Sequence, residues 1–326
     1  MAKVLGIGNA LIDIMTRLDH DEHLELFKLP KGSMTLVDEL LSEEVTKGTE
    51  HLEKTLASGG SASNTIHGLA RLGVQTAFMG KVGKDQFGDF FNEDLVKNGI
   101  DPKLFFSEKQ SGRAIALVSP DSERTFATYL GAAIDLSAED LKPEHFEGYD
   151  YFHIEGYLVQ NHGLIETAVR LAKENNLQVA LDLASYNVVE ANLDFLRLLV
   201  RQYVDIVFAN EEEARAFTGK EPGEAVHELA ELCGIAVVKT GKNGSIIKKG
   251  KDIYNIKAVE ATCLDTTGAG DLYASGFLYG LAHKLPLEKC GQIGSLLGGH
   301  VIEVIGAKLN RQRWEEVLEE VERIKE

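Results

Sequence analysis

The chain has 326 residues, with 34 Lys or Arg against 51 Asp or Glu, so its formal net charge is −17. A content of 44% hydrophobic residues with only 6 Pro is typical of a globular protein and excludes a disordered, collagen-like or coiled-coil chain. The acidic balance argues against a nucleic-acid-binding protein, because neutralising phosphates requires clustered Lys and Arg.

Short apolar runs alternate with longer helical patterns along most of the chain. Near-continuous apolar strands separated by helices are typical of a parallel sheet covered on both faces, so we expect an α/β fold. The runs expected to form buried strands are residues 4–8, 75–79, 151–154, 178–181, 205–208 and 235–238.

Two regions interrupt this alternation. Residues 11–36 and 111–130 each read as a pair of strands without an intervening helix, and a turn at 120–123 separates the second pair. We therefore expect a small antiparallel sheet that projects from the main domain. No linker or internal repeat divides the chain, so residues 1–326 are predicted to form a single domain.

The cysteines and the apolar stretches indicate the cellular setting. Cys233, Cys263 and Cys290 are far apart and lack CxxC spacing, which predicts reduced thiols rather than a metal or disulfide framework. The chain starts on a strand-like segment without a signal-peptide pattern. The uncharged stretches, such as residues 290–302, are shorter than the roughly 20 residues that span a bilayer. We expect a cytoplasmic protein that does not bind membranes.

The first strand leads into a possible ligand site. Residues 6–13, Gly-Ile-Gly-Asn-Ala-Leu-Ile-Asp, begin like a dinucleotide-binding fingerprint, but Leu11 replaces the third glycine and a strand follows, which argues against a Rossmann site. Asn9 and Asp13 lie beyond the carboxyl end of this strand, where open α/β sheets bind ligands. Because an unpaired buried carboxylate is costly, Asp13 is more often a binding group than a core residue.

A glycine pair lies before the next predicted helix, in residues 58–64. Gly59 and Gly60 form a turn, and Ser61 and Asn64 then lie three residues apart on one helix face. That face could hydrogen-bond vicinal hydroxyl groups. The alternative is that Ser61 caps the helix and Asn64 is simply solvated.

Two loops follow later strands at the same predicted sheet edge. Residues 210–213, Asn-Glu-Glu-Glu, could order a hydrated Mg²⁺, and the alternative is a solvated helix N-terminus. Thr240, Gly241 and Gly244 form a small-residue turn suited to nucleotide phosphates. The alternative for this second loop is an ordinary hairpin turn at residues 243–244.

The strongest motif is residues 265–271, Asp-Thr-Thr-Gly-Ala-Gly-Asp, which precedes a helical stretch. The amides of Gly268, Ala269 and Gly270 would be free at the helix N-terminus, where an anion can bind. A carboxylate beside an anion site suits removal of a proton from a hydroxyl that attacks a phosphoryl group, so Asp271 is a candidate general base. The alternative is that Asp271 only complements the helix dipole.

No P-loop or protein-kinase motif is present. The four motifs, in this order, instead resemble the ribokinase-like (pfkB) family of carbohydrate and nucleoside kinases. Residues 59–64 and 80–88 resemble its N-terminal signature, and residues 265–271 its C-terminal signature. The resemblance implies a three-layer α/β/α ribokinase-like domain with a mostly parallel central sheet and a small β-sheet lid, formed by about 11–36 and 111–130.

The resemblance also implies an ATP-dependent phosphotransferase that uses Mg²⁺. Asp271 would be the catalytic base, and residues 268–270 would form the anion hole. Arg124 resembles a lid arginine that closes over the transferring phosphate. A non-catalytic nucleotide-binding protein is a further interpretation, against which the intact Asp271 argues.

The nucleotide-binding residues are implied in the same way. Asn210 and Glu213 match an Asn-x-x-Glu element that governs Mg²⁺, held by Glu213 through water, and phosphate. Thr240, Gly241 and Gly244 match the ATP loop.

Many members of the family also need a monovalent cation, usually K⁺, beside the anion hole. Asp265 and Thr267 match that position. Backbone carbonyls from about 301 to 306 would complete the site.

Substrate choice depends on the first strand. Sugar kinases of the family typically place the binding Asn and Asp two positions apart, whereas Asn9 and Asp13 are four apart, as in adenosine kinases. Leu11 would then line the base pocket, and Tyr157 would pack against the purine. By the same resemblance, Asp13 would bind the ribose hydroxyls together with residues from the glycine turn, namely Gly59, Gly60, Ser61 and Asn64.

The predicted reaction is therefore phosphorylation of a primary hydroxyl of a nucleoside, with adenosine converted to AMP. The alternative is a sugar kinase for ribose, fructose or a keto-deoxy sugar acid. The sequence leaves open both a monomer and a homodimer formed through the lid.

Overall fold

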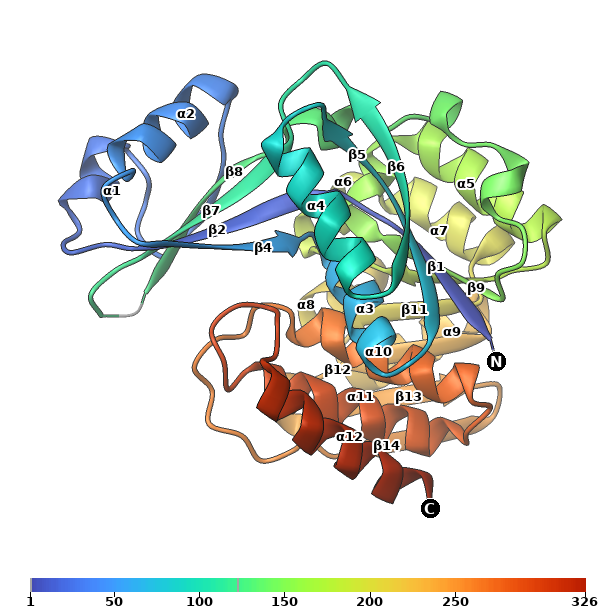
Figure 1. Ribbon diagram of the computed structural model, residues 1–326. Helices are drawn as coiled ribbons and strands as arrows, with labels where there is room; N and C mark the ends of the chain where they lie inside the picture. The colour runs from blue at the N-terminus through green and yellow to red at the C-terminus, as the bar shows by residue number, and fades with distance from the viewer. Residues whose placement is uncertain (1, 122) are drawn as a thin grey trace.

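The computed structural model describes residues 2–121 and 123–326, and a nine-stranded sheet forms its centre (Figure 1). The strand order is β14-β13-β12-β11-β10-β9-β1-β5-β6. Strands β6 to β12 of this order pair in parallel, whereas β13 and β14 are antiparallel. The strands are β1 (Lys3–Ile7), β5 (Gln75–Gly83), β6 (Ile100–Ser107), β9 (Tyr151–Glu155), β10 (Gln178–Asp182), β11 (Ile206–Asn210), β12 (Ile235–Lys239), β13 (Ser245–Lys249) and β14 (Asp252–Ile256).

Helices cover both faces of this sheet, because its strands are apolar on both sides. Val4 and Leu5 of β1, for example, are fully buried in two different cores. One face carries α3 (Ser61–Arg71), α4 (Gln86–Lys97), α10 (Ala269–Ala282), α11 (Leu287–Val301) and α12 (Arg311–Lys325). The other carries α5 (His162–Glu174), α6 (Tyr186–Ala191), α7 (Leu193–Tyr203), α8 (Glu211–Thr218) and α9 (Pro222–Leu232). The predicted three-layer α/β/α architecture is confirmed.

A second sheet of five strands, here called the outer sheet, projects from the main body (Figure 1). Its order is β3-β8-β7-β2-β4, and the short helices α1 (Glu22–Leu26) and α2 (Glu39–Gly48) belong to the same part of the chain. The strands are β2 (Leu11–Arg17), β3 (Met34–Leu36), β4 (Lys54–Gly59), β7 (Gly112–Val118) and β8 (Arg124–Tyr129).

The outer sheet differs from the sequence prediction in three respects. No helix was expected within residues 11–36, but α1 separates β2 from β3. The sheet is mixed rather than antiparallel, because β2 pairs in parallel with β7, and β3 with β8. Strands β2 and β7 both leave the central sheet, after β1 and β6, and therefore run in the same direction. Strand β4 was not expected: it lies outside residues 11–36, and its sequence, Lys-Thr-Leu-Ala-Ser-Gly, has little β propensity.

Within the described residues, every helix is too short or too polar to cross a lipid bilayer. Cys233 and Cys290 are buried and Cys263 is exposed, and each is a free thiol.

Candidate active site

The candidate site lies where the carboxyl ends of β1, β9, β10, β11 and β12 meet the N-terminal ends of α3 and α10. Asp271, in the first turn of α10, is bonded directly to α3. Ser61 Oγ donates to Asp271 Oδ1 at 2.7 Å, and Asn64 Nδ2 donates to Oδ2 at 3.0 Å. Burial raises the pKa of Asp271 to about 6, although these two hydrogen bonds oppose the shift. The carboxylate is therefore held in place and is basic enough to accept a proton near neutral pH.

The turn before α10 has the shape of an anion site, but one of its amides is engaged. Gly268 has φ +77°, which favours glycine, and a Cβ there would lie 2.5 Å from the Cβ of Ala307. Ala269 N donates to the Thr266 carbonyl at 3.2 Å, so the expectation that all three amides of 268–270 are free is not met. The Ala269 amide is used for the hydrogen bond that closes this tight turn, so it is not free to bind an anion.

Glu155, at the end of β9, joins the first strand to α3. Asn9 Nδ2 donates to Glu155 Oε1 at 2.5 Å, and Ala62 N donates to Oε2 at 3.1 Å. Burial raises the pKa of Glu155 to about 7. Gly60 packs against the same region at φ +95°, and a Cβ there would lie 2.1 Å from the Asn9 carbonyl oxygen. The glycine turn therefore contacts the opening strand directly.

Asp13 faces the other glycine of this turn. A Cβ on Gly59 would lie 2.2 Å from Asp13 Oδ1, so the carboxyl group packs directly against the backbone of Gly59 and leaves no room for a side chain there. Burial raises the pKa of Asp13 to about 7, although the charge of Lys308 opposes the shift. Lys308 Nζ donates to Ser58 Oγ at 2.7 Å and lies 3.5 Å from Asp94. The Asp13 carboxyl group therefore changes its protonation state near neutral pH.

The variant Asp13→Asn is expected to raise the melting temperature relative to the wild type more at pH 8 than at pH 5. A pKa of about 7 in the folded protein lies above that of the unfolded chain, so this carboxyl destabilises the fold progressively as the pH rises from about 4 through about 7. Asn removes that charge. Thermal unfolding at both pH values measures the effect, and Asp252→Asn, at an exposed position, controls for net charge. An equal temperature difference at both pH values would contradict it.

A buried ion pair lies beside the anion turn. Lys239 Nζ, at the end of β12, donates to Asp182 Oδ2 at 2.9 Å, and it would lie 3.0 Å from a Cβ on Gly270. Burial alone would lower the pKa of Lys239, but Asp182 and Glu213 together raise it. This pair was not predicted from the sequence. Asp182 and Lys239 each end a mostly apolar strand, and a charged residue in that position could have indicated a functional group.

Asn210 and Glu213 bind each other. Asn210 Nδ2 donates to Glu213 Oε1 at 2.7 Å, Asn210 N donates to Oε2 at 2.8 Å, and Glu213 N donates back to Asn210 Oδ1 at 2.9 Å. This is a capping box at the start of α8, as in the alternative of a helix N-terminus, except that Glu213 is buried rather than solvated. Burial raises the pKa of Glu213 to about 7, and the nearby charge of Asp182 adds to the effect.

Thr240, Gly241 and Gly244 form the turn between β12 and β13. Thr240 N donates to the Gly244 carbonyl at 2.8 Å. A Cβ on Gly244, which has φ +93°, would lie 1.8 Å from the Ile256 carbonyl oxygen, so only glycine fits. The turn is the hairpin of the alternative interpretation, and it also lies at the same sheet edge as Asn210, whose Cα pairs with that of Lys239.

Asp265 and Thr267, the residues matched to a monovalent cation, are occupied by an arginine. Both guanidinium Nη atoms of Arg124, on β8, contact the two carboxylate oxygens of Asp265, and Nη1 also donates to Thr267 Oγ1 at 2.9 Å. Gly306 N donates to Asp265 Oδ2 at 2.6 Å, and Thr267 N donates to Oδ1 at 2.7 Å. Arg124 was expected over a phosphate, whereas here it binds the loop.

The two residues matched to a purine pocket lie near the opening strand. Leu11 is the first residue of β2, and its Cδ2 would lie 2.5 Å from a Cβ on Gly112. Tyr157 lies in a 3₁₀ turn after β9, and both side chains are partly buried. Burial raises the pKa of Tyr157 to about 12, and the charges of Glu155 and Glu213 contribute. Its hydroxyl is therefore within electrostatic reach of the site.

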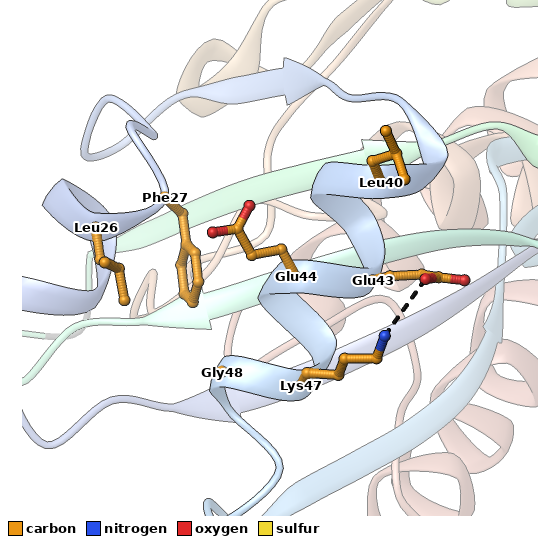
Figure 2. A pocket seen from close by; sticks show the side chains of 7 residues that line it. All are labelled: Leu26, Phe27, Leu40, Glu43, Glu44, Lys47 and Gly48. Atoms are coloured by element: carbon orange, nitrogen blue, oxygen red, sulfur yellow. Dashed lines mark ion pairs between the residues drawn. The ribbon is translucent and has the colours of Figure 1, made fainter.

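A separate surface pocket lies on the outer sheet's helices, and Figure 2 shows it. A Lys47–Glu43 ion pair of 3.5 Å borders it. None of its lining residues is among the predicted site residues. They are Leu26, Phe27, Leu40, Glu43, Glu44, Lys47 and Gly48.

Known proteins resemble this chain over most of its length. The family model described as pfkB family carbohydrate kinase matches residues 33–313. A probable sugar kinase from Rhizobium etli CFN 42 is 34% identical and superimposes with a TM-score of 0.87 over 98% of each chain. The adenosine kinase from Sinorhizobium meliloti is also 34% identical, with a TM-score of 0.86 over 98% of this chain and 99% of that one.

A curated relative is similar over a shorter part. The 5-dehydro-2-deoxygluconokinase of Clostridium beijerinckii is 31% identical over 73% of this chain and 76% of its own length. Together these similarities confirm the ribokinase-like fold expected from the motifs.

Proposed function

Because the chain belongs to the pfkB family of carbohydrate kinases, and is thus a nucleoside or sugar kinase, we propose that it phosphorylates adenosine to AMP with ATP and Mg²⁺. The observation that carries the proposal is the bonding of Asp271 to Ser61 and Asn64. This bonding supports the role of Asp271 as a base, because it holds a carboxylate of suitable pKa between the anion turn and the glycine turn. The four-residue spacing of Asn9 and Asp13 and the similarity to an adenosine kinase support adenosine as the acceptor.

In the proposed mechanism, Asp271 accepts the proton of the attacking 5′-hydroxyl, while Ser61 and Asn64 hold its carboxylate in place. Asp13, with Asn64 and the backbone of Gly60, binds the ribose hydroxyls. Asn9 donates to Glu155, and this hydrogen bond positions the carboxyl end of β1 beside the substrate. Positioning of this kind and electrostatic stabilisation supply most of the catalysis in phosphoryl transfer.

The charge that develops on the transferring group would meet donors from three elements. Free amides of the turn at 268–270 and the ammonium of Lys239 lie side by side. Thr240, Gly241 and Gly244 would contact the nucleotide phosphates. A hydrated Mg²⁺ fits beside Glu213, because its charge would relieve the repulsion between Glu213 and Asp182 that contributes to the raised pKa. When bound, Mg²⁺ neutralises phosphate charge.

A sugar kinase is the second candidate, and Lys308 is the observation that favours it. This ammonium lies close enough to Asp13 for its charge to lower the pKa of that carboxyl. A cation beside the hydroxyl-binding residue would suit an acidic sugar, and a gluconate-type kinase is among the relatives.

A substrate panel separates the two candidates. ADP release with ATP and Mg²⁺ is measured for adenosine, other nucleosides, ribose, fructose and keto-deoxy sugar acids. We expect the highest kcat/KM for adenosine and loss of its turnover in Asp13→Asn. A higher kcat/KM for a sugar or sugar acid would refute adenosine as the substrate.

The kcat/KM of the enzyme is expected to fall steeply as the pH is lowered. Asp271 must be unprotonated to act as a base, and its pKa of about 6 predicts one limb of the kcat/KM profile. Asp13, with a pKa of about 7, must be unprotonated to accept from ribose, which adds a second limb. ADP release measured from pH 5 to 8.5 should therefore drop with a slope approaching two below pH 6. A flat profile between pH 5 and 7 is incompatible with both roles.

A further inference from the structure

We propose that the guanidinium group of Arg124 takes the place of the monovalent cation beside the anion turn, so that this kinase does not require K⁺. The inference rests on the proposed kinase function only for its activity measurement. It assigns Arg124 as a positioning residue for the loop 265–267, in place of a bound metal ion.

The carboxylate of Asp265 has no acceptor site left for a metal ion. A carboxylate offers about four lone-pair sites. Two of these accept backbone amides, from Thr267 and Gly306, and the Nη atoms of Arg124 occupy the other two, one on each oxygen. The Thr267 hydroxyl, a further expected ligand, accepts from the same guanidinium at 2.9 Å. The two side chains expected to bind the cation are therefore not available.

The guanidinium supplies the charge that the cation would supply. It carries one positive charge, which balances the negative charge of the Asp265 carboxylate. The pair is shielded from water: Asp265 is 3% exposed, and the Arg124 side chain is 16% exposed and lies 5.6 Å from the Phe126 ring. A bidentate pair in such a site is held more firmly than an exposed one.

The pair also joins two parts of the chain that lie far apart in sequence. Arg124 is on β8 of the outer sheet, and Asp265 begins the loop that leads to Gly268 and Asp271. Asp265 in turn binds Gly306, in the segment after α11. The orientation of the anion turn therefore depends on a side chain of the outer sheet, whereas a bound K⁺ would leave the two parts independent.

Activity in different salts tests the proposal. Wild type, Arg124→Ala and Arg124→Lys are assayed with tetramethylammonium, Na⁺ or K⁺ as the cation. We expect wild-type kcat to vary less than about twofold. Arg124→Ala should lose roughly 10- to 100-fold in tetramethylammonium, the effect of removing charge-assisted hydrogen bonds, and should be rescued in part by added guanidinium or K⁺. Arg17→Ala, at an exposed position of β2, is the matched control and should show neither loss nor rescue.

Melting temperatures provide a readout that does not need the substrate. Guanidinium at low millimolar concentration or K⁺ should raise the melting temperature of Arg124→Ala and leave that of the wild type unchanged. This measurement stands even if neither nucleosides nor sugars are turned over, so the two proposals can fail separately. Activation of the wild type by K⁺ of tenfold or more, or a folded Arg124→Ala that responds to neither guanidinium nor K⁺, would overturn the inference.

Discussion

Replacing Asp271 with Asn is expected to lower kcat by roughly 10²- to 10⁴-fold, the contribution of a positioned general base. Asn has nearly the same shape and can still accept from Asn64, so the geometry of α3 and α10 should persist. What it lacks is a site that takes the hydroxyl proton at neutral pH. The affinity for ATP should stay within about twofold, because in the proposed mechanism Asp271 acts on the acceptor.

Steady-state kinetics of ADP release and calorimetric titration of a non-hydrolysable ATP analogue measure the two effects. Asp252→Asn carries the same change of charge at an exposed site and serves as the control. The Asn variant should also melt no lower than the wild type at pH 8, since it removes a half-buried charge whose pKa is raised in the fold. A kcat within threefold of the wild-type value would exclude Asp271 as the base.

Replacing Lys239 with Met is expected to destabilise the fold by about 3–5 kcal/mol, because it leaves the buried Asp182 carboxylate without its partner. Asp182 is 6% exposed and bonds Lys239 at 2.9 Å. The double variant Lys239→Met/Asp182→Asn removes both charges and should recover most of this loss. Chemical denaturation at pH 7.5 measures the free energy of unfolding of each variant.

The double variant also separates stability from catalysis. If Lys239 contacts the transferring phosphate, the double variant should recover its stability but not its activity. Its kcat/KM for ATP should stay roughly 10- to 100-fold below the wild-type value. Recovery of both stability and kcat/KM would limit Lys239 to a structural role. Lys220→Met, which removes an exposed 2.9 Å pair with Glu228, is the control and should change stability by less than about 1 kcal/mol.

The inner strands of the central sheet, from β12 to β5 in its order, could be predicted because they are buried on both faces. A run such as residues 235–238, which are all buried or nearly so, leaves an unbroken apolar signal in the sequence. The edge strand β6 carries Pro102 and several half-exposed residues, and β4 is mostly exposed or half-exposed. Strands of this kind have no regular apolar pattern, so only their partners in the sheet define them.

The motif residues were identifiable because each group is contiguous in sequence. Glu155, Lys239 and Lys308 were not, because what defines them is a partner far along the chain. Lys308 and its acceptor Ser58 are separated by 250 positions, and Lys239 and Asp182 by 57. Spacing within one segment contains no information on such pairs.

The outer sheet is built from two stretches of chain that interleave. Residues 11–59 supply β2, β3 and β4, and residues 112–129 supply β7 and β8. In the order β3-β8-β7-β2-β4, the second stretch lies between β3 and β2 of the first. Recombination that brought in one stretch from a relative would pair its strands with strands of the other parent, and their side chains would not match across the sheet. An exchange of this sheet between relatives must therefore replace both stretches together, whereas point substitutions can proceed one at a time.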